Sequence, residues 1–144
     1  MTQTIKIKKI HPKAIVPKIA TKGSACFDLY ACENFVLGNG HFHRTKTGLV
    51  FEIPKGWHVK IYNRSGMASR GIIMPNAPGI IDSDYRGEIF VMLYGLFMKR
   101  QEIFQIGSRV AQGELIKGEP VEFEVVNKLT ETERGSGGLG STGK

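Results

Sequence analysis

Hydrophobic and polar residues alternate with a period of two along much of the chain. Isoleucines alternate with lysines over residues 5–8, and residues 57–62 and 121–125 show the same pattern. Successive side chains of a β-strand point to opposite faces, so each segment is predicted to be a half-buried strand. The continuous apolar run over residues 89–94 predicts a further strand that is covered on both faces.

Glycine and proline interrupt the chain at short intervals, and no stretch of ten residues has a convincing helical period. One short helical turn fits, around residues 66–71. Many short strands separated by regular turn signals predict an all-β fold, either a sandwich, a jelly roll or a barrel. We expect one β domain over residues 1–133, followed over 134–144 by a flexible glycine-rich tail.

The chain has 144 residues, of which 41% are hydrophobic, and a net charge of +7. These values fit one soluble domain, and no apolar run reaches the ~18 residues needed to span a bilayer. The N-terminal segment lacks the apolar region of a secretory signal. Cys26 and Cys32 are expected to be free thiols in a reducing compartment.

A basic protein binds nucleic acid, a membrane surface or a polyanionic small molecule. The lysine-rich stretch from Lys6 to Lys22 has no aromatic residue between its cations, which favours a solvated strand face over a nucleic-acid-binding arm. The remaining cations lie among glycines and hydroxyl side chains. This pattern is better suited to phosphate groups than to a duplex.

The ten residues 79–88 carry the densest set of functional groups in the chain. Asp82, Asp84, Tyr85 and Arg86 lie there between two glycines, and a strand-like segment follows at once. We expect a tight turn between two strands. The backbone of such a turn can hold a small planar ligand while a nearby carboxylate acts on it.

Two isolated polar residues leave two interpretations each. Asp28 interrupts an otherwise apolar strand. It is either a strand-end acid that faces water, or an acid that binds a metal ion through water molecules, as Mg²⁺ prefers. Asn76 lies near a proline-rich turn, where asparagine is usually a turn former, although its amide can also hydrogen-bond the edge of a base.

Residues 64–71 place an arginine, a serine and a glycine in sequence just before the expected helical turn. They form either a helix cap with surface arginines or an anion-binding loop, because N–H groups at a helix start and arginine side chains both bind phosphate.

Residues 109–112 are either a solvated strand end or a segment whose Gln112 amide donates to a phosphate. Composition alone favours a disordered tail at 134–144, and the alternative is a lid that closes over phosphates.

Taken in order, five segments resemble the five motifs of the trimeric deoxyuridine triphosphatase (dUTPase) family. The matching segments are residues 27–30 (FDLY), 64–68 (RSGMA), 79–88 (GIIDSDYRGE), 109–112 (RVAQ) and 134–143 (RGSGGLGSTG). The third and fifth are highly specific, whereas the fourth is weak alone. Together they extend over nearly the whole chain.

The resemblance implies a jelly-roll-like β fold, a homotrimer whose active sites are shared between subunits, and Mg²⁺-dependent hydrolysis of dUTP to dUMP and pyrophosphate. It implies that Asp82 activates the attacking water and that Tyr85 lies under the deoxyribose. The implied uracil-reading residues are Asn76, Gly79 and Ile81. The implied phosphate ligands are Arg64, Ser65, Gly66 and Gln112, and Asp28 is the implied metal partner through water. The implied lid residues are Arg134, Leu139, Gly140, Ser141 and Thr142.

Three positions depart from the family pattern. Leu139 stands where the family usually has an aromatic that stacks on uracil, and leucine lacks a π-face. The segment after Gln112 does not run directly into an apolar strand, which allows a β-bulge there. Residues 24–26 replace the usual small pair before Asp28, which affects the expected geometry around that acid.

Two other functions are compatible with these residues. One is a deoxycytidine triphosphate deaminase, whose family shares the fold. The other is a nucleotide-gated regulatory or binding protein. We expect a cytoplasmic protein, whether cellular or encoded by a virus or phage, with no membrane contact and with nucleic acid an unfavoured partner.

Overall fold

The fold consists of antiparallel β-sheets, in agreement with the predicted all-β class. The structure is a computed structural model that describes residues 2–139. One sheet has the order β1 (Lys6–Lys9), β4 (Phe42–Glu52), β8 (Glu88–Gly95), β6 (Ile72–Ile73). The second has the order β2 (Phe27–Tyr30), β10 (Arg109–Lys117), β5 (Trp57–Tyr62), β7 (Gly79–Ile81). A small sheet pairs β3 (Phe35–Leu37) with β9 (Glu102–Phe104), and α1 (Ser65–Ala68) is a single turn.

The hydrophobic core is built from the inward faces of the strands, as the period-two pattern predicts. On β5, Val59 and Ile61 are buried while their neighbours are half-buried. On β8, Ile89, Val91 and Leu93 are fully buried. The opposite face of β8 is only half-buried, so the expected coverage of both faces is incomplete within one chain.

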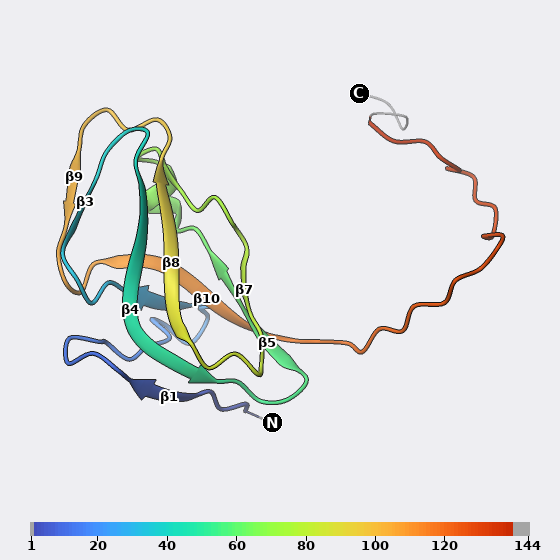
Figure 1. Cartoon of the computed structure of the whole chain (residues 1–144), viewed down its shortest axis with the longest axis horizontal. Coiled ribbons are helices and arrows are strands. Elements are labelled where there is room, and N and C mark those ends of the chain that lie inside the picture. Colours follow the sequence, from blue (N-terminus) through green and yellow to red (C-terminus); the bar gives the residue numbers. More distant parts are fainter. Residues whose placement is uncertain (1, 140–144) are drawn as a thin grey trace.

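The predicted strand at residues 121–125 is wrong for the single chain. No strand is assigned to these residues, and the exposed fractions are 69% for Val121, 94% for Phe123 and 99% for Val125. After β10 ends at Lys117, the chain leaves the β body as an extended segment (Figure 1). We call residues 118–139 the arm. The alternation marks a segment that can form a strand, but a strand also needs a partner for its backbone groups and its apolar face.

The bulge that the sequence allows after Gln112 is not there. The register shift in β10 lies between Arg109 and Ala111, and Gln112–Lys117 pair regularly with β5. Gly113 serves a packing role instead. A Cβ at this position would lie 2.5 Å from the ring of Phe27, so glycine leaves the room that this ring occupies beside the strand.

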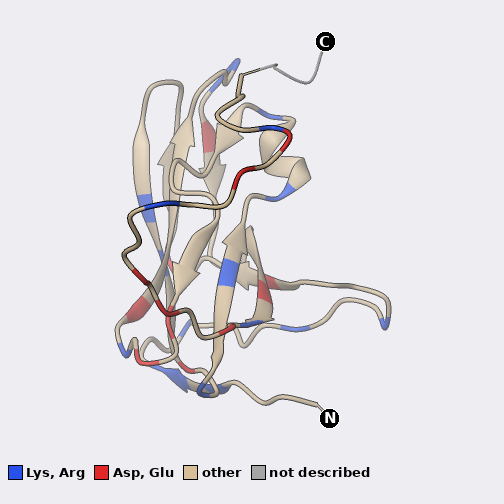
Figure 2. Cartoon of the chain, turned by 90° about the vertical axis from the view of Figure 1, so that its right-hand side faces the viewer, with Lys and Arg blue, Asp and Glu red and all other residues tan. Residues whose placement is uncertain are grey.

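The surface agrees with a solvated lysine-rich edge. β1 is an edge strand with Lys6 and Lys8 exposed, and Lys6 pairs with Glu52 at 2.6 Å. Lys and Arg are spread over strands and loops and are interspersed with acids in the view of Figure 2. Within residues 2–139, no helix is long and apolar enough to cross a membrane.

Candidate active site

The turn after β7 forms a small cavity of about 210 Å³. Five residues singled out from the sequence line it together, namely Asn76, Gly79, Ile81, Asp82 and Tyr85. The other lining residues are Ile61, Met74, Ile80, Glu88, Phe90 and Met92. Ile61 lies on β5, Ile80 on β7, and Glu88, Phe90 and Met92 on β8. The strand patterns over residues 57–62 and 89–94 were the signals that could have identified Ile61, Phe90 and Met92.

Asn76 and Gly79 meet inside this cavity. β7 pairs with β5 so that Gly79 lies opposite Ile61. A Cβ on Gly79 would lie 3.3 Å from the Asn76 amide nitrogen and 3.6 Å from Ile61 Cβ, so the amide packs closely against the glycine backbone. An amide offers both a donor and an acceptor, and here it faces a cavity that suits a flat ring.

Tyr85 folds back over the turn. Its N–H donates to the Asp82 carbonyl at 3.2 Å, and its hydroxyl donates to the Glu88 carbonyl at 3.2 Å. A Cβ on Gly87 would lie only 2.2 Å from the Tyr85 hydroxyl oxygen, so the ring reaches this position because residue 87 is glycine. The ring remains 42% exposed and presents a surface at the cavity.

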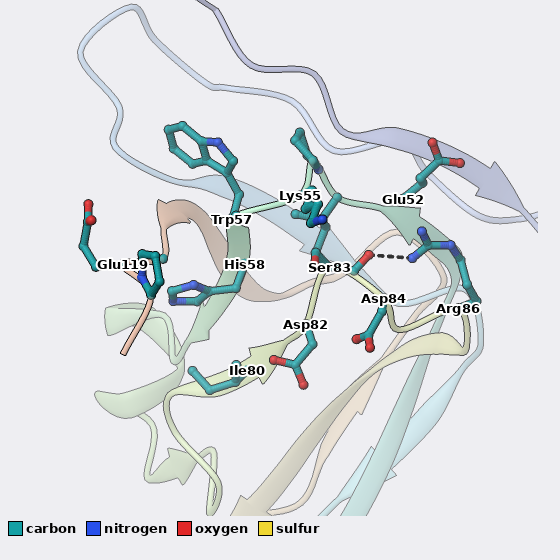
Figure 3. A pocket seen from close by; sticks show the side chains of 15 residues that line it. Glu52, Lys55, Trp57, His58, Ile80, Asp82, Ser83, Asp84, Arg86 and Glu119 are labelled. Carbon is teal, nitrogen blue, oxygen red and sulfur yellow. Dashed lines mark hydrogen bonds between the residues drawn. The ribbon is translucent and has the colours of Figure 1, made fainter. Parts of the chain in front are cut away.

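Asp82 lies between this cavity and a larger groove of about 1190 Å³. Figure 3 shows the groove, to which β5 contributes Trp57 and His58. Arg86 donates to the Ser83 carbonyl at 2.7 Å and braces the turn. Among the described residues, the Asp82 carboxylate has no hydrogen bond or ion pair, so its oxygens are available to a water molecule.

A second cluster forms where three neighbouring strands bring distant residues side by side. Gln112 on β10 lies opposite Asp28 on β2 and opposite Tyr62 on β5. Asp28 pairs with Arg64 Nε at 3.1 Å and with Arg109 Nη1 at 3.5 Å. Only 15% of the Asp28 side chain is exposed, so it is a paired strand acid and not an acid that simply faces water.

The remaining groups of this cluster are tied to one another. Gln112 donates its amide to the Asn63 carbonyl at 3.2 Å, and the Tyr62 hydroxyl donates to Glu114 at 3.2 Å. Desolvation, followed by this hydrogen bond, raises the pKa of Tyr62. Burial is also the main cause that raises the pKa of Cys26, and the nearby Glu114 and Asp28 carboxylates raise it further. Both groups therefore stay neutral beside the acids.

The short turn expected around residues 66–71 is confirmed as α1. Arg64 is its N-cap residue, but a guanidinium has no acceptor for the backbone N–H groups of the turn. Its side chain pairs with Asp28. Ser65 and Gly66 begin the turn, and Met67 is fully buried beneath it. We call residues 64–66 the cradle.

Mg²⁺ was expected near Asp28. Within residues 2–139, no group of three or more His, Cys, Asp or Glu side chains could hold a metal ion directly. The Asp28 carboxylate meets one arginine at each oxygen. Because a carboxylate has about four lone-pair sites, it can still accept hydrogen bonds from metal-bound water. The residues fit an ion bound through water.

Over residues 134–139, the described part of the tail, no contact with either cluster is seen. Among the described residues, the Arg134 side chain donates to the Gly137 carbonyl at 3.0 Å, and Leu139 is fully exposed. The predicted residues Gly140, Ser141 and Thr142 lie outside the described residues. None of the cradle residues, Gln112 or Asp28 lines the 210 Å³ cavity, so the candidate site consists of two separate halves in one chain.

Comparison with known proteins gives a consistent result. The dUTPase family model matches residues 12–143. A deoxyuridine 5'-triphosphate nucleotidohydrolase from Helicobacter pylori (strain Shi470) is 43% identical over 140 residues, covering 96% of each chain. The same enzyme from Nautilia profundicola is 44% identical over 143 residues, covering 97% of this chain and 99% of the relative.

Solved structures share the fold. A mutant of the dUTPase of Staphylococcus bacteriophage 80alpha, bound to dUpNHpp, superposes with a TM-score of 0.86 at 23% identity, covering 99% of this chain and 100% of that one. A mutant dUTPase of phage phi11, described with a structural Mg(II) ion, superposes with a TM-score of 0.81 at 18% identity, covering 89% and 99%. With the family model matched almost end to end and relatives above 40% identity, this chain belongs to the dUTPase family.

Proposed function

We propose that this protein is a dUTP diphosphatase that hydrolyses dUTP to dUMP and pyrophosphate by attack of water on the α-phosphorus. The observation that carries the proposal is the 210 Å³ cavity, which gathers an amide, an exposed aromatic ring and a carboxylate from one short segment. That carboxylate has no partner among residues 2–139. The family relatives named for this activity support it.

The cavity fits a pyrimidine nucleoside. The Asn76 amide and the backbone from Gly79 to Ile81 present donors and acceptors to a flat ring. Uracil offers O4 and N3–H to such groups, whereas cytosine would leave a buried polar group unpaired, which discriminates strongly between the two bases. In this proposal the Tyr85 ring, which lines the cavity, packs under the deoxyribose and leaves no room for a 2′-hydroxyl.

Asp82 is the group that takes a proton in this proposal. Its carboxylate is unpaired among the described residues and lies at the cavity edge. It accepts a hydrogen bond from a water molecule and removes the proton as the water oxygen bonds to the α-phosphorus, while pyrophosphate leaves. General-base assistance of this kind contributes about 10²- to 10⁴-fold to the rate.

The second cluster supplies the charge that a triphosphate requires. Arg64, Ser65, Gly66 and Gln112 bind phosphate oxygens, with Arg64 held in place by Asp28. Mg²⁺, when bound through water at Asp28, neutralises phosphate charge and fixes the conformation of the chain of phosphates. Preorganised donors of this kind stabilise charge that develops in the transition state.

We infer that the two halves meet between copies of the chain in a homotrimer. The 210 Å³ cavity proposed to hold the base and the cluster of Asp28, Gln112 and the cradle proposed to hold the phosphates are separate in one chain. A complete site therefore needs residues from another copy. The arm leaves the body with three exposed apolar side chains at alternate positions, which suits addition as a strand to a neighbouring sheet. We also infer that the glycine-rich tail, from Arg134 through Leu139 to Thr142, closes over the phosphates.

We place the enzyme in a cytoplasm, either of its own cell or of a host if it is encoded by a virus or phage. Cys26 and Cys32 are free, and thiols persist in a reducing compartment.

The test is pyrophosphate release from dUTP, dCTP, dTTP and UTP, each with Mg²⁺ and with a chelator. Release from dUTP alone, lost with the chelator, is the expected result. A folded, assembled protein that releases no pyrophosphate from dUTP would refute the proposal. Ammonia release from dCTP would instead identify a deaminase.

A further inference from the structure

Arg70 contacts the turn that carries the cradle through its side chain. Its Nε donates to the Gly66 carbonyl at 2.8 Å, and one terminal nitrogen contacts Met67 Sδ at 3.0 Å. The other terminal nitrogen forms an ion pair with Glu102 on β9. The guanidinium also lies over the Phe104 ring, at 5.7 Å from its centroid. One planar group therefore touches both α1 and β9.

The Gly66 carbonyl depends on these side-chain contacts. The turn ends so early that the Arg70 N–H donates to Met67 and not to Gly66. Among the described hydrogen bonds, the Gly66 carbonyl accepts only from Arg70 Nε and from the Ser69 hydroxyl, the latter at 3.2 Å. Arg70 thus takes the place of the backbone donor that a longer helix would supply.

Glu102 connects this turn to a rigid part of the fold. Its side chain is 19% exposed, and β9 is anchored by Phe104, whose ring stacks on Phe35 at 4.6 Å. The Gly71 carbonyl, next to Arg70, accepts from Leu96 N–H at 2.8 Å. A one-turn helix has little stability of its own, so its orientation relative to the sheets depends on such contacts.

We propose that Arg70, held by Glu102, is a positioning residue that fixes the cradle for phosphate binding. This rests on the proposed function of the cradle, but it concerns a residue that does not itself touch the substrate. At the start of the cradle, the Arg64 side chain is held by its ion pair with Asp28. At the end of the cradle, the Gly66 carbonyl is held by its hydrogen bond from Arg70. The cradle is thereby braced from two separate sheets.

The chemistry of arginine is required for this role. Its fork donates to Gly66 and to Glu102 at the same time, whereas a lysine has one terminal nitrogen and cannot hold both partners in this geometry. Lysine at position 70 should therefore restore the charge opposite Glu102 but only part of the bracing. Glutamine removes the charge and most of the donors.

The kinetic test compares Arg70→Gln, Arg70→Lys and Glu102→Gln with the wild-type protein. Arg100→Gln is the matched control, because Arg100 borders the same small surface cavity as Arg70 but has no hydrogen bond or ion pair among the described residues. For dUTP, kcat/KM should fall about ten- to hundredfold in Arg70→Gln, mainly through kcat, since the base cavity is unchanged. The kcat/KM of Arg70→Lys should lie between those of Arg70→Gln and the wild type, and that of Arg100→Gln should match the wild type.

Hydrogen exchange of the amides of residues 67–69 gives a second readout without substrate. Loss of a charged hydrogen bond should speed their exchange about tenfold in Arg70→Gln and leave Arg100→Gln unchanged. Unchanged exchange in Arg70→Gln, or turnover equal to that of Arg100→Gln, would overturn the proposal. Absence of turnover in the wild-type protein would refute the activity alone, and the exchange measurement would still decide the role of Arg70.

Discussion

Replacing Phe123 with alanine tests whether the arm binds another copy of the chain. In one chain Phe123 is 94% exposed, and Val121 and Val125 on the same side of the alternation are 69% and 99% exposed. A strand that packs this side on a neighbour would bury all three side chains. Glu122 and Glu124 would then lie on the opposite face.

The size of the effect follows from the exposed phenyl ring. Burying a phenylalanine side chain is worth about 2–3 kcal/mol, which corresponds to a factor of about 30–150 for each arm. Complete dissociation of a trimer releases three arms. The trimer dissociation constant should therefore rise by roughly 10⁴- to 10⁶-fold in Phe123→Ala.

Sedimentation velocity over a range of protein concentrations measures this constant directly. Turnover of dUTP on dilution measures it indirectly, because the proposed shared site would be lost on dissociation. Glu122→Ala is the control and should assemble like the wild type. The reasoning is refuted if Phe123→Ala keeps the wild-type dissociation constant. Dissociation of Glu122→Ala to the same extent would mean that the wrong face of the arm was assigned to the contact.

Three further predictions concern the site and the thiols. Asp82→Asn should bind a dUTP analogue normally in calorimetry and lose about 10²- to 10⁴-fold in kcat, so near-normal turnover would remove Asp82 from the proposed role. Gly87→Ala places a methyl group against the Tyr85 hydroxyl. It should lower kcat/KM for dUTP about tenfold and weaken the discrimination against UTP. An unchanged ratio of kcat/KM for dUTP to that for UTP would contradict the role of Tyr85. Burial raises the pKa of Cys26 and Cys32, so the folded thiols keep protons that the unfolded chain loses. The stability that the two protonated thiols contribute is present below the ordinary thiol pKa and is lost as pH rises through the raised pKa values. Replacing both cysteines with serine should therefore flatten the fall in melting temperature at alkaline pH. An equal fall in the double variant would contradict the raised thiol pKa values.

The features that sequence predicts well are those set by short segments. The Tyr85 N–H bonds the Asp82 carbonyl three residues earlier, so the run 79–88 brings its own carboxylate and ring to one cavity. The one-turn helix is equally local. In both cases, the contacts that fix the geometry join residues only a few positions apart.

The bracing of the cradle was not predictable in the same way. Arg70 and Glu102 are 32 residues apart, and a sequence interpretation leaves Arg70 as a surface arginine or a phosphate ligand. Its contact with Gly66 is local, but its ion pair with Glu102 forms only because β9 lies beside α1 in the folded chain. The bulge before Ala111 likewise depends on how β10 pairs with β2 on one side and β5 on the other.

The sequence by itself determined which side of each strand is apolar, where the chain turns and which residues the turn at 79–88 presents, because period-two alternation and turn chemistry are local properties. Tertiary structure decided that Asp28, Gln112 and Tyr62 lie in one row and that Arg64 reaches Asp28. It also decided that residues 121–125 find no partner strand within residues 2–139 of their own chain. Strand pairing joins segments far apart in sequence, and its register depends on the packing of the whole core, which no single segment encodes.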